Sequence, residues 1–250
     1  MPYLQGKYGQ CFYRHWSSPQ PNAIAILIHG YGEHTGHYHR LANYLAINNI
    51  NVWGIDHVGH GLSYGKNGFF ESVDELSSNL EELYNVIKEA QPNLPIAVIG
   101  HSLGGITGTN FCLNHPDKIK ALVALGTPYE GLPELDPSLE LIMSKDQFYL
   151  DEIENDALKF NTDLALDNLW QQISAKKSVF YKQVKEFKPP VLLINGEFDC
   201  FAPPTVAQKW AELFPNAKYT IIPKGYHDIP NDKSHREVAE KIVQFIRHSI

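Results

Sequence analysis

Ile99-Gly100-His101-Ser102-Leu103-Gly104-Gly105 is the stretch that most constrains the fold of this chain. It contains the pattern G-x-S-x-G and lies between the apolar run Ile96–Ile99 and a stretch that predicts a helix. A strand, a sharp turn and a helix in this order are typical of a nucleophile elbow, which holds a serine hydroxyl at the top of a sheet. Gly100 and Gly104 leave room in the turn, because side chains there would clash. The stretch therefore predicts that Ser102 is a nucleophile on a strained turn.

Short apolar runs alternate with helical patterns along most of the chain. Apolar strands of this length, separated by helices, predict a parallel sheet that is buried on both faces. The fold class that we expect is therefore α/β, with a mostly parallel, doubly wound sheet. Gly9–Trp16 predicts an additional antiparallel strand at the sheet edge. The apolar runs are Ile24–Ile28, Val52–Ile55, Ile96–Ile99, Ala121–Leu125, Val191–Ile194 and Tyr219–Ile222.

Two sequence patterns mark the starts of helices. In Ser72-Val73-Asp74-Glu75, and again in Ser234-His235-Arg236-Glu237, a serine stands three positions before a glutamate. This spacing is a capping box, in which the serine side chain accepts a hydrogen bond from the first helical turn. Apolar residues at helical spacing follow both patterns, so we expect an amphipathic helix after each.

One region breaks the alternation of strands and helices. From about residue 128 to 188 the sequence has no strong strand signal. Ligands of doubly wound sheets bind at the carboxyl ends of the strands, and this insertion follows a strand that ends at Leu125. We therefore expect a single domain, 1–250, with a core of residues 1–127 and 189–250 and a helical cap insertion of about 128–188.

A serine nucleophile needs a general base and an acid that orients the base. Asp199 and His227 each follow a predicted strand directly, so we expect both at the same sheet edge as Ser102. The chain order of serine, acid and histidine is the one found with such elbows. We predict Ser102 as nucleophile, Asp199 as orienting acid and His227 as general base. Glu197 is the alternative acid, and Asp228 is expected to lie at the surface or to bond to its own loop.

The oxyanion that forms during acyl transfer is stabilised by backbone N–H groups. One donor is expected to be the N–H of Leu103, the residue after the predicted nucleophile. The second is expected from the loop after the strand Ile24–Ile28, which reads His29-Gly30-Tyr31-Gly32-Glu33-His34. Tyr31 lies between two glycines in this loop, so we predict Tyr31 and Leu103 as the two donors.

The composition limits the classes of partner. The chain has 250 residues, of which 43% are hydrophobic and 20% are charged, and its net charge is −7. It has no basic patch, which argues against nucleic acid, and no apolar stretch of the ~18 residues that a transmembrane segment needs. We expect no secretory signal, because no positive region followed by an apolar run is present at the start. Three widely spaced cysteines predict a reduced, cytoplasmic protein.

Several histidines raise the question of a metal site. They show no H-E-x-x-H pattern or comparable ligand set, and histidines beside glycines at strand ends commonly bond to neighbouring backbone. We therefore predict no metal and no cofactor. Asp56, which also follows a strand, is expected to pin its loop. The histidines concerned are His29, His34, His37, His39, His57 and His60.

These segments resemble the α/β-hydrolase superfamily and, within it, the monoacylglycerol lipase and lysophospholipase-like branch of the serine aminopeptidase S33 type. The resemblance covers the chain from about residue 22 onward and is weakest in the cap. It implies an α/β-hydrolase fold, a triad of Ser102, Asp199 and His227, and an oxyanion hole formed by Tyr31 and Leu103. The segments that carry it are His29–His34 with Tyr38, Asp56-His57-Val58-Gly59-His60-Gly61-Leu62-Ser63, Gly100–Gly105, Asp199 and Tyr226-His227.

The resemblance also implies the reaction. We expect a serine carboxylic ester hydrolase that works through an acyl-enzyme and cleaves acyl esters or lipids, first of all monoacylglycerols. A lysophospholipase or a short-chain carboxylesterase with the same triad is the alternative. A serine aminopeptidase and a non-catalytic ligand-binding α/β-hydrolase are further alternatives, and the presence of all three triad residues argues against the last.

The cap leaves substrate and membrane contact open. Only the short cluster Leu139–Met143 is apolar enough to enter a bilayer surface, and its acidic neighbours would be repelled by anionic lipid. Peripheral membrane contact through the cap and the oligomeric state both stay open. Several aromatic residues fit either an acyl pocket or the core: Phe69, Phe70, Phe148, Tyr149, Trp170 and Tyr181.

Overall fold

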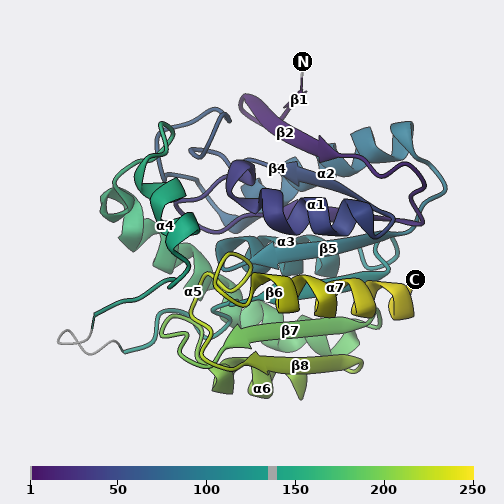
Figure 1. Ribbon diagram of the computed structural model, residues 1–250. Coiled ribbons are helices and arrows are strands. Elements are labelled where there is room, and N and C mark those ends of the chain that lie inside the picture. The colour runs from purple at the N-terminus through teal and green to yellow at the C-terminus, as the bar shows by residue number, and fades with distance from the viewer. Residues whose placement is uncertain (1, 135–139) are drawn as a thin grey trace.

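An eight-stranded sheet forms the centre of the molecule. The computed structural model describes residues 2–134 and 140–250 and orders the strands β1-β2-β4-β3-β5-β6-β7-β8 (Figure 1). Strands β3 to β8 run parallel to their neighbours within that set, and β2 pairs antiparallel with β4. This arrangement confirms the α/β class and all six apolar runs. The strands are β1 (Tyr3–Gln5), β2 (Gln10–Trp16), β3 (Ala23–Ile28), β4 (Ile50–Ile55), β5 (Ile96–His101), β6 (Ala121–Leu125), β7 (Val191–Gly196) and β8 (Ala217–Ile222).

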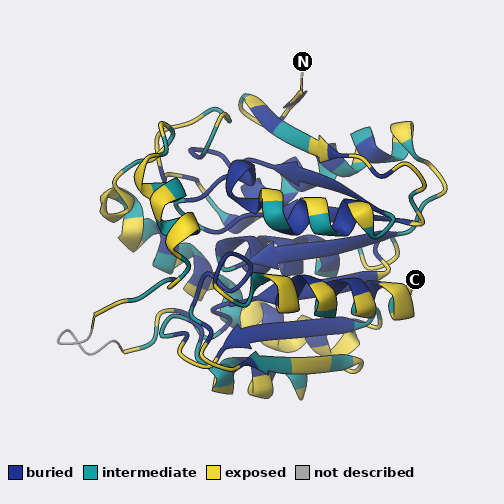
Figure 2. Cartoon of the chain, in the orientation of Figure 1, coloured by how far each residue is buried: buried dark blue, intermediate teal, exposed yellow. Residues whose placement is uncertain are grey.

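Helices cover both faces of the sheet, which is why the central strands are apolar throughout. Helices α1 (His39–Ile47) and α7 (His235–Ser249) cover one face, and α2 (Val73–Ala90), α3 (Leu103–Asn114) and α6 (Pro204–Ala211) cover the other (Figure 1). Alternate residues of one strand enter opposite cores, because successive side chains of a strand point to opposite faces. Every residue of β3 to β7 is buried, as the dark blue strands of Figure 2 show.

Two expectations were wrong: the place of β2 at the sheet edge and the capping box at Ser234. β2 is not at the sheet edge, because the three-residue strand β1 pairs antiparallel with its outer side. Ser234 precedes α7, but its side chain makes no capping hydrogen bond and its backbone (φ −88°, ψ 9°) is not extended as a capping box needs. The first capping box is confirmed, because Ser72 is extended and its hydroxyl accepts from the N–H of Glu75 at 3.1 Å.

The insertion is helical. Its described residues form α4 (Gln147–Glu154), α5 (Leu166–Gln183) and two short 3-10 turns, η2 (Thr162–Ala165) and η3 (Val184–Glu186), and they contain no strand. Helix α4 lies beyond the carboxyl ends of the parallel strands, at the left of Figure 1. The apolar cluster Leu139–Met143 falls partly outside the description, because residues 135–139 are not described.

Candidate active site

Ser102 sits on a strained turn between β5 and α3. Its φ of 49° lies in the left-handed region, which non-glycine residues rarely adopt and which is common where function fixes a backbone. A Cβ on Gly100 would lie 2.2 Å from the carbonyl oxygen of Gly104, and a Cβ on Gly104 would lie 2.2 Å from that of Ile28. The expected strain and the need for both glycines are therefore confirmed, and the elbow packs directly against the end of β3.

The structure brings the three predicted triad residues into one hydrogen-bonded chain. His227 Nε2 lies 2.9 Å from Ser102 Oγ, and His227 Nδ1 lies 2.9 Å from Asp199 Oδ1. Asp199 comes from the loop after β7 and His227 from the loop after β8, so three strand ends contribute. Both Asp199 and His227 are buried, whereas Ser102 is partly exposed. In this geometry His227 can accept the proton of Ser102 while its other nitrogen donates to the carboxylate.

The acid is fixed by its own loop. Asp199 Oδ1 also accepts from the backbone N–H groups of Phe201 at 3.0 Å and Ala202 at 2.8 Å. The alternative acid, Glu197, is exposed and its Oε2 accepts from the N–H of Lys224 at 2.8 Å. Glu197 therefore bonds to the turn that follows β8, and it is Asp199 that contacts His227.

Of the two predicted oxyanion donors, Leu103 is the first residue of α3 and Tyr31 lies in the loop after β3. Within the part of the chain that the structure describes, the backbone N–H groups of Tyr31 and Leu103 have no hydrogen-bond acceptor. Free donors of this kind are what a developing oxyanion requires. The side chain of Tyr31 points elsewhere, because its hydroxyl donates to the carbonyl oxygen of Thr162 in the cap at 3.0 Å.

A buried charged cluster behind the elbow was missed at the sequence level. His101 Nδ1 lies 3.0 Å from Glu33 Oε2, and His101 Nε2 lies 3.0 Å from the carbonyl oxygen of His227. The same Glu33 accepts from the hydroxyls of Tyr38 at 2.6 Å and of Tyr149, in cap helix α4, at 2.8 Å. Glu33 belongs to the H-G-x-G-E-H motif, which was the sequence signal for this cluster. Only the fold places His101 beside Glu33.

The cluster holds opposite charges at neutral pH. Burial alone would lower the pKa of His101, but the adjacent Glu33 carboxylate outweighs burial and raises this pKa to about 9. Burial alone would raise the pKa of Glu33, but His101 and the hydroxyl of Tyr38 hold it below its usual range. An imidazolium donates from both nitrogens, so protonated His101 can bond to Glu33 and to the His227 carbonyl together.

We expect the His101 charge to make stability pH-dependent. The pKa of His101 is about 9 in the folded state against 6.5 for the unfolded side chain, so the folded form binds more protons between these values. This pKa difference adds up to about 3 kcal/mol to the free energy of unfolding. The addition is complete below pH 6.5 and is lost as the pH rises toward 9. Urea unfolding between these pH values measures it in the wild type and in His101→Gln. If the free energy of unfolding changed with pH in the same way in both proteins, the prediction would be contradicted.

Asp228 differs from its expected place at the surface. It is buried, and its carboxylate lies 3.9 Å from His101 Nε2. Burial, together with the negative charge of Glu33, raises the pKa of Asp228 to about 7. Its backbone does bond to a loop, because its N–H donates to the carbonyl oxygen of Met143 at 2.8 Å.

His29 and His60, in the loops after β3 and β4, bond to nearby backbone. His29 Nδ1 lies 2.7 Å from the carbonyl oxygen of Gly30, and His60 Nδ1 lies 2.9 Å from that of Val58. Burial lowers the pKa of His57 to about 3 and of His60 to about 4, so both are neutral at physiological pH. These bonds match the expectation that such histidines satisfy nearby backbone.

His34 and His37, which follow β3, lie close to the carboxylate of Asp156. The three side chains are near enough to one another to hold a metal ion. The Nε2 atoms of the two histidines lie 2.8 Å and 3.1 Å from Asp156 Oδ2, in the cap. His34 Nδ1 accepts from the N–H of Gly36, so its Nε2 carries the proton and donates to Asp156. The nitrogen that a metal would need is therefore committed to a hydrogen bond that ties the cap to the core.

Asp56 pins its loop, as expected. Its Oδ1 accepts from the N–H and the hydroxyl of Thr35, at 2.8 and 2.7 Å, and its Oδ2 accepts from the N–H of Leu62 at 2.9 Å. The carboxylate thereby joins the loop after β3 to the loop after β4, and its oxygens have structural partners.

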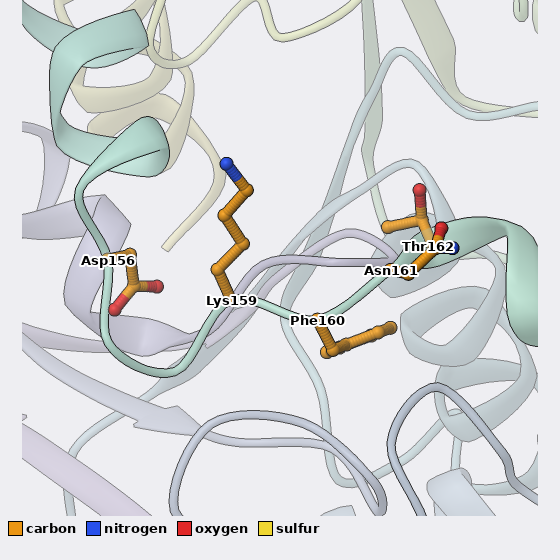
Figure 3. Close-up of a pocket in the computed structure, with 5 residues that line it drawn as sticks. All are labelled: Asp156, Lys159, Phe160, Asn161 and Thr162. Atoms are coloured by element: carbon orange, nitrogen blue, oxygen red, sulfur yellow. The ribbon is translucent and has the colours of Figure 1, made fainter.

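An open hollow lies on the cap, apart from the triad. Figure 3 shows its five lining side chains, which come from the segment between α4 and α5: Asp156, Lys159, Phe160, Asn161 and Thr162. None of the triad residues lines it. The loop is nevertheless tied to the core, through Asp156 and through the carbonyl oxygen of Thr162.

The family of this chain is shown by its similarity to known proteins. Residues 19–234 match the profile of the Hydrolase_4 family, described as serine aminopeptidase S33. The chain belongs to this family. It is thus an α/β-hydrolase of the monoacylglycerol lipase-like branch, and the resemblance noted in its motifs is confirmed.

Individual relatives agree with the family. A monoacylglycerol lipase of Mycolicibacterium smegmatis is 31% identical over 119 residues, which are 48% of this chain and 42% of that protein. A monoglyceride lipase of Rattus norvegicus is 29% identical over 147 residues, 58% of this chain and 48% of that protein. The matched segments thus span less than half the length of these two relatives.

A solved structure supports the fold along the whole chain. The crystal structure of Paleococcus ferrophilus monoacylglycerol lipase superimposes with a TM-score of 0.81 at 23% identity and covers 96% of this chain and 99% of that one. Among the described residues of the present chain, no helix is both long and apolar enough to cross a membrane.

Proposed function

We propose that this protein is a serine carboxylic ester hydrolase that forms an acyl-enzyme at Ser102. The observation that carries the proposal is the hydrogen-bonded chain Ser102–His227–Asp199 on a strained elbow. Membership of the monoacylglycerol lipase-like branch supports an ester as substrate.

The steps follow from the geometry. His227 Nε2 takes the proton of Ser102 as Oγ attacks the acyl carbonyl carbon, and the carbonyl oxygen becomes an oxyanion. The N–H groups of Leu103 and Tyr31 donate to that oxyanion, while Asp199 stabilises the imidazolium of His227. His227 then gives its proton to the leaving alcohol, and the acyl group stays on Ser102. His227 then takes a proton from water, which attacks the ester of Ser102. The carboxylic acid is released as His227 returns the proton to Ser102 Oγ.

The surface beside the base favours an apolar acyl group. The ring of Phe201 lies 5.1 Å from that of His227, and Trp170, from cap helix α5, lies parallel to Phe201 with centroids 6.4 Å apart. Other aromatic residues that could have lined an acyl pocket serve different roles. Tyr149 is buried against Glu33, and Phe148 is exposed on the outside of α4. The contacts of Phe201 with His227 and Trp170 favour an apolar acyl group, and the similarity to monoacylglycerol and monoglyceride lipases favours glycerol as the alcohol, so we infer that monoacylglycerols are the substrates.

Fatty-acid release from a series of glycerol monoesters, from acetyl to stearoyl, tests the substrate class. We expect maximal kcat/KM on medium or long acyl chains, because each methylene buried against the aromatic surface contributes up to about 0.8 kcal/mol to binding. Lysophosphatidylcholine with the same acyl chain is the matched control for the alcohol group. Activity confined to the shortest esters would contradict a monoacylglycerol lipase and leave a short-chain carboxylesterase; preference for lysophosphatidylcholine would indicate a lysophospholipase.

A further inference from the structure

The loop that carries His227 is bonded to the cap segment that leads into α4. Asp232 is buried, and its Oδ2 accepts from the backbone N–H of Tyr226 at 3.0 Å. Its Oδ1 accepts from the backbone N–H of Lys145 at 2.9 Å and from the hydroxyl of Ser144 at 3.1 Å. One carboxylate therefore joins the residue before His227 to the segment that leads into α4.

A backbone bond forms a second tie on the other side of the histidine. The N–H of Asp228, the residue after His227, donates to the carbonyl oxygen of Met143 at 2.8 Å. Both chain neighbours of His227 are thus held, one by Met143 directly and one through Asp232. The backbone of the base is fixed between two anchor points in the cap.

A third tie reaches His227 through the charged cluster. The carbonyl oxygen of His227 accepts from His101 Nε2, and His101 is held by Glu33. Tyr149, near the start of α4, donates its buried hydroxyl to the other oxygen of Glu33. The first turn of α4 therefore touches the same framework that holds the histidine from behind.

We propose that Asp232, assisted by Tyr149, is a positioning residue that uses cap segment 143–149 to fix His227 against Ser102. This inference depends on the proposed function, in which His227 is the base. A buried carboxylate with three donors makes strong charge-assisted hydrogen bonds, and it leaves those donors unpaired when it is removed. Segment 143–149 is accordingly bonded to the histidine loop at Tyr226 and Asp228.

Asp232→Asn is the direct test. The single amide oxygen of Asn would stay with Lys145 and Ser144, which leaves its NH₂ group facing the N–H of Tyr226 and frees the His227 loop. We expect kcat to fall about 10- to 100-fold with KM changed less than about 3-fold, because small misplacements of a base reduce rate more than binding. We also expect the downfield proton resonance of the His227–Asp199 hydrogen bond to shift or broaden, while the thermal unfolding midpoint shows a folded protein.

Glu130→Gln is the matched control. Glu130 also ties cap to core, through Trp210 at 2.8 Å and through Lys177 and Lys209, but it does not contact the His227 loop. We expect this variant to retain kcat and the downfield resonance. Equal losses in both carboxylate variants would overturn the proposal, since any weakening of the cap would then suffice.

Two further measurements keep the outcome decisive. If Asp232→Asn does not fold, Tyr149→Phe replaces it, with an expected 3- to 10-fold loss of kcat and the same change in the resonance. A folded variant whose kcat and resonance equal those of the wild type would overturn the proposal. If the wild type neither hydrolyses esters nor reacts with a fluorophosphonate at Ser102, the proposed function fails. The downfield resonance of the His227–Asp199 hydrogen bond then tests the positioning role alone: a change in the Asp232→Asn variant supports it, and no change overturns it.

Discussion

Replacing Ser102 by alanine is expected to reduce ester hydrolysis at least about 10⁴-fold, because the acyl-enzyme can no longer form. The backbone of this residue is fixed by the elbow and by the bond from its N–H to the carbonyl oxygen of Leu125 at 2.9 Å. The alanine variant keeps both features, so we expect a thermal unfolding midpoint within about 2 °C of the wild type.

Covalent labelling separates loss of the nucleophile from loss of the fold. A fluorophosphonate should label the wild type and Ser174→Ala, which removes an exposed hydroxyl from cap helix α5, but not Ser102→Ala. Mass spectrometry of the labelled peptide identifies the modified serine. Hydrolysis by a folded Ser102→Ala protein at the wild-type rate would exclude the proposed mechanism.

Asp199→Asn is expected to lower kcat about 10³- to 10⁴-fold. The amide oxygen of Asn can still accept from the N–H groups of Phe201 and Ala202, so the loop is retained. The carboxylate that holds the reactive tautomer of His227 and stabilises its protonated form is lost, and this loss slows the reaction. Steady-state kinetics on a monoacylglycerol measures the effect.

Glu197→Gln is the control that tests the acid. Glu197 lies two residues away on the same loop but bonds to the N–H of Lys224, so we expect its kcat to stay within about 2-fold of the wild type. A larger loss in Glu197→Gln than in Asp199→Asn would reverse the assignment of the acid.

Much of the fold could be predicted from local sequence. Strands such as β3 and β6 are continuous apolar runs, and a run of this kind is stable only between two layers of helices. The elbow could be predicted equally well from the sequence. A side chain at Gly100 would clash within the turn, and one at Gly104 would clash with the neighbouring strand β3. Local chemistry determined these features, so local sequence was enough.

The features that escaped prediction depend on distant contacts. Strand β1 is three residues long and exists because β2 offers it an edge. Asp228 was expected at the surface or bonded to a loop, but it is buried 3.9 Å from His101, and its N–H bonds to Met143 in the cap. Tyr149 fitted either an acyl pocket or the core, and its partner Glu33 lies 116 residues away in the chain. Sequence spacing carries no information about such contacts.

The ties between cap and core restrict how the cap of this protein can be exchanged. Tyr31, whose N–H we propose as an oxyanion donor, donates its hydroxyl to the carbonyl oxygen of Thr162, and Asp156 bonds to two core histidines at once. A new cap grafted from a relative would therefore have to supply a carboxylate, a carbonyl oxygen and a phenol at matching places. We therefore expect engineered changes of substrate range in this protein to succeed more readily by substitution between these bonded points than by exchange of the whole cap.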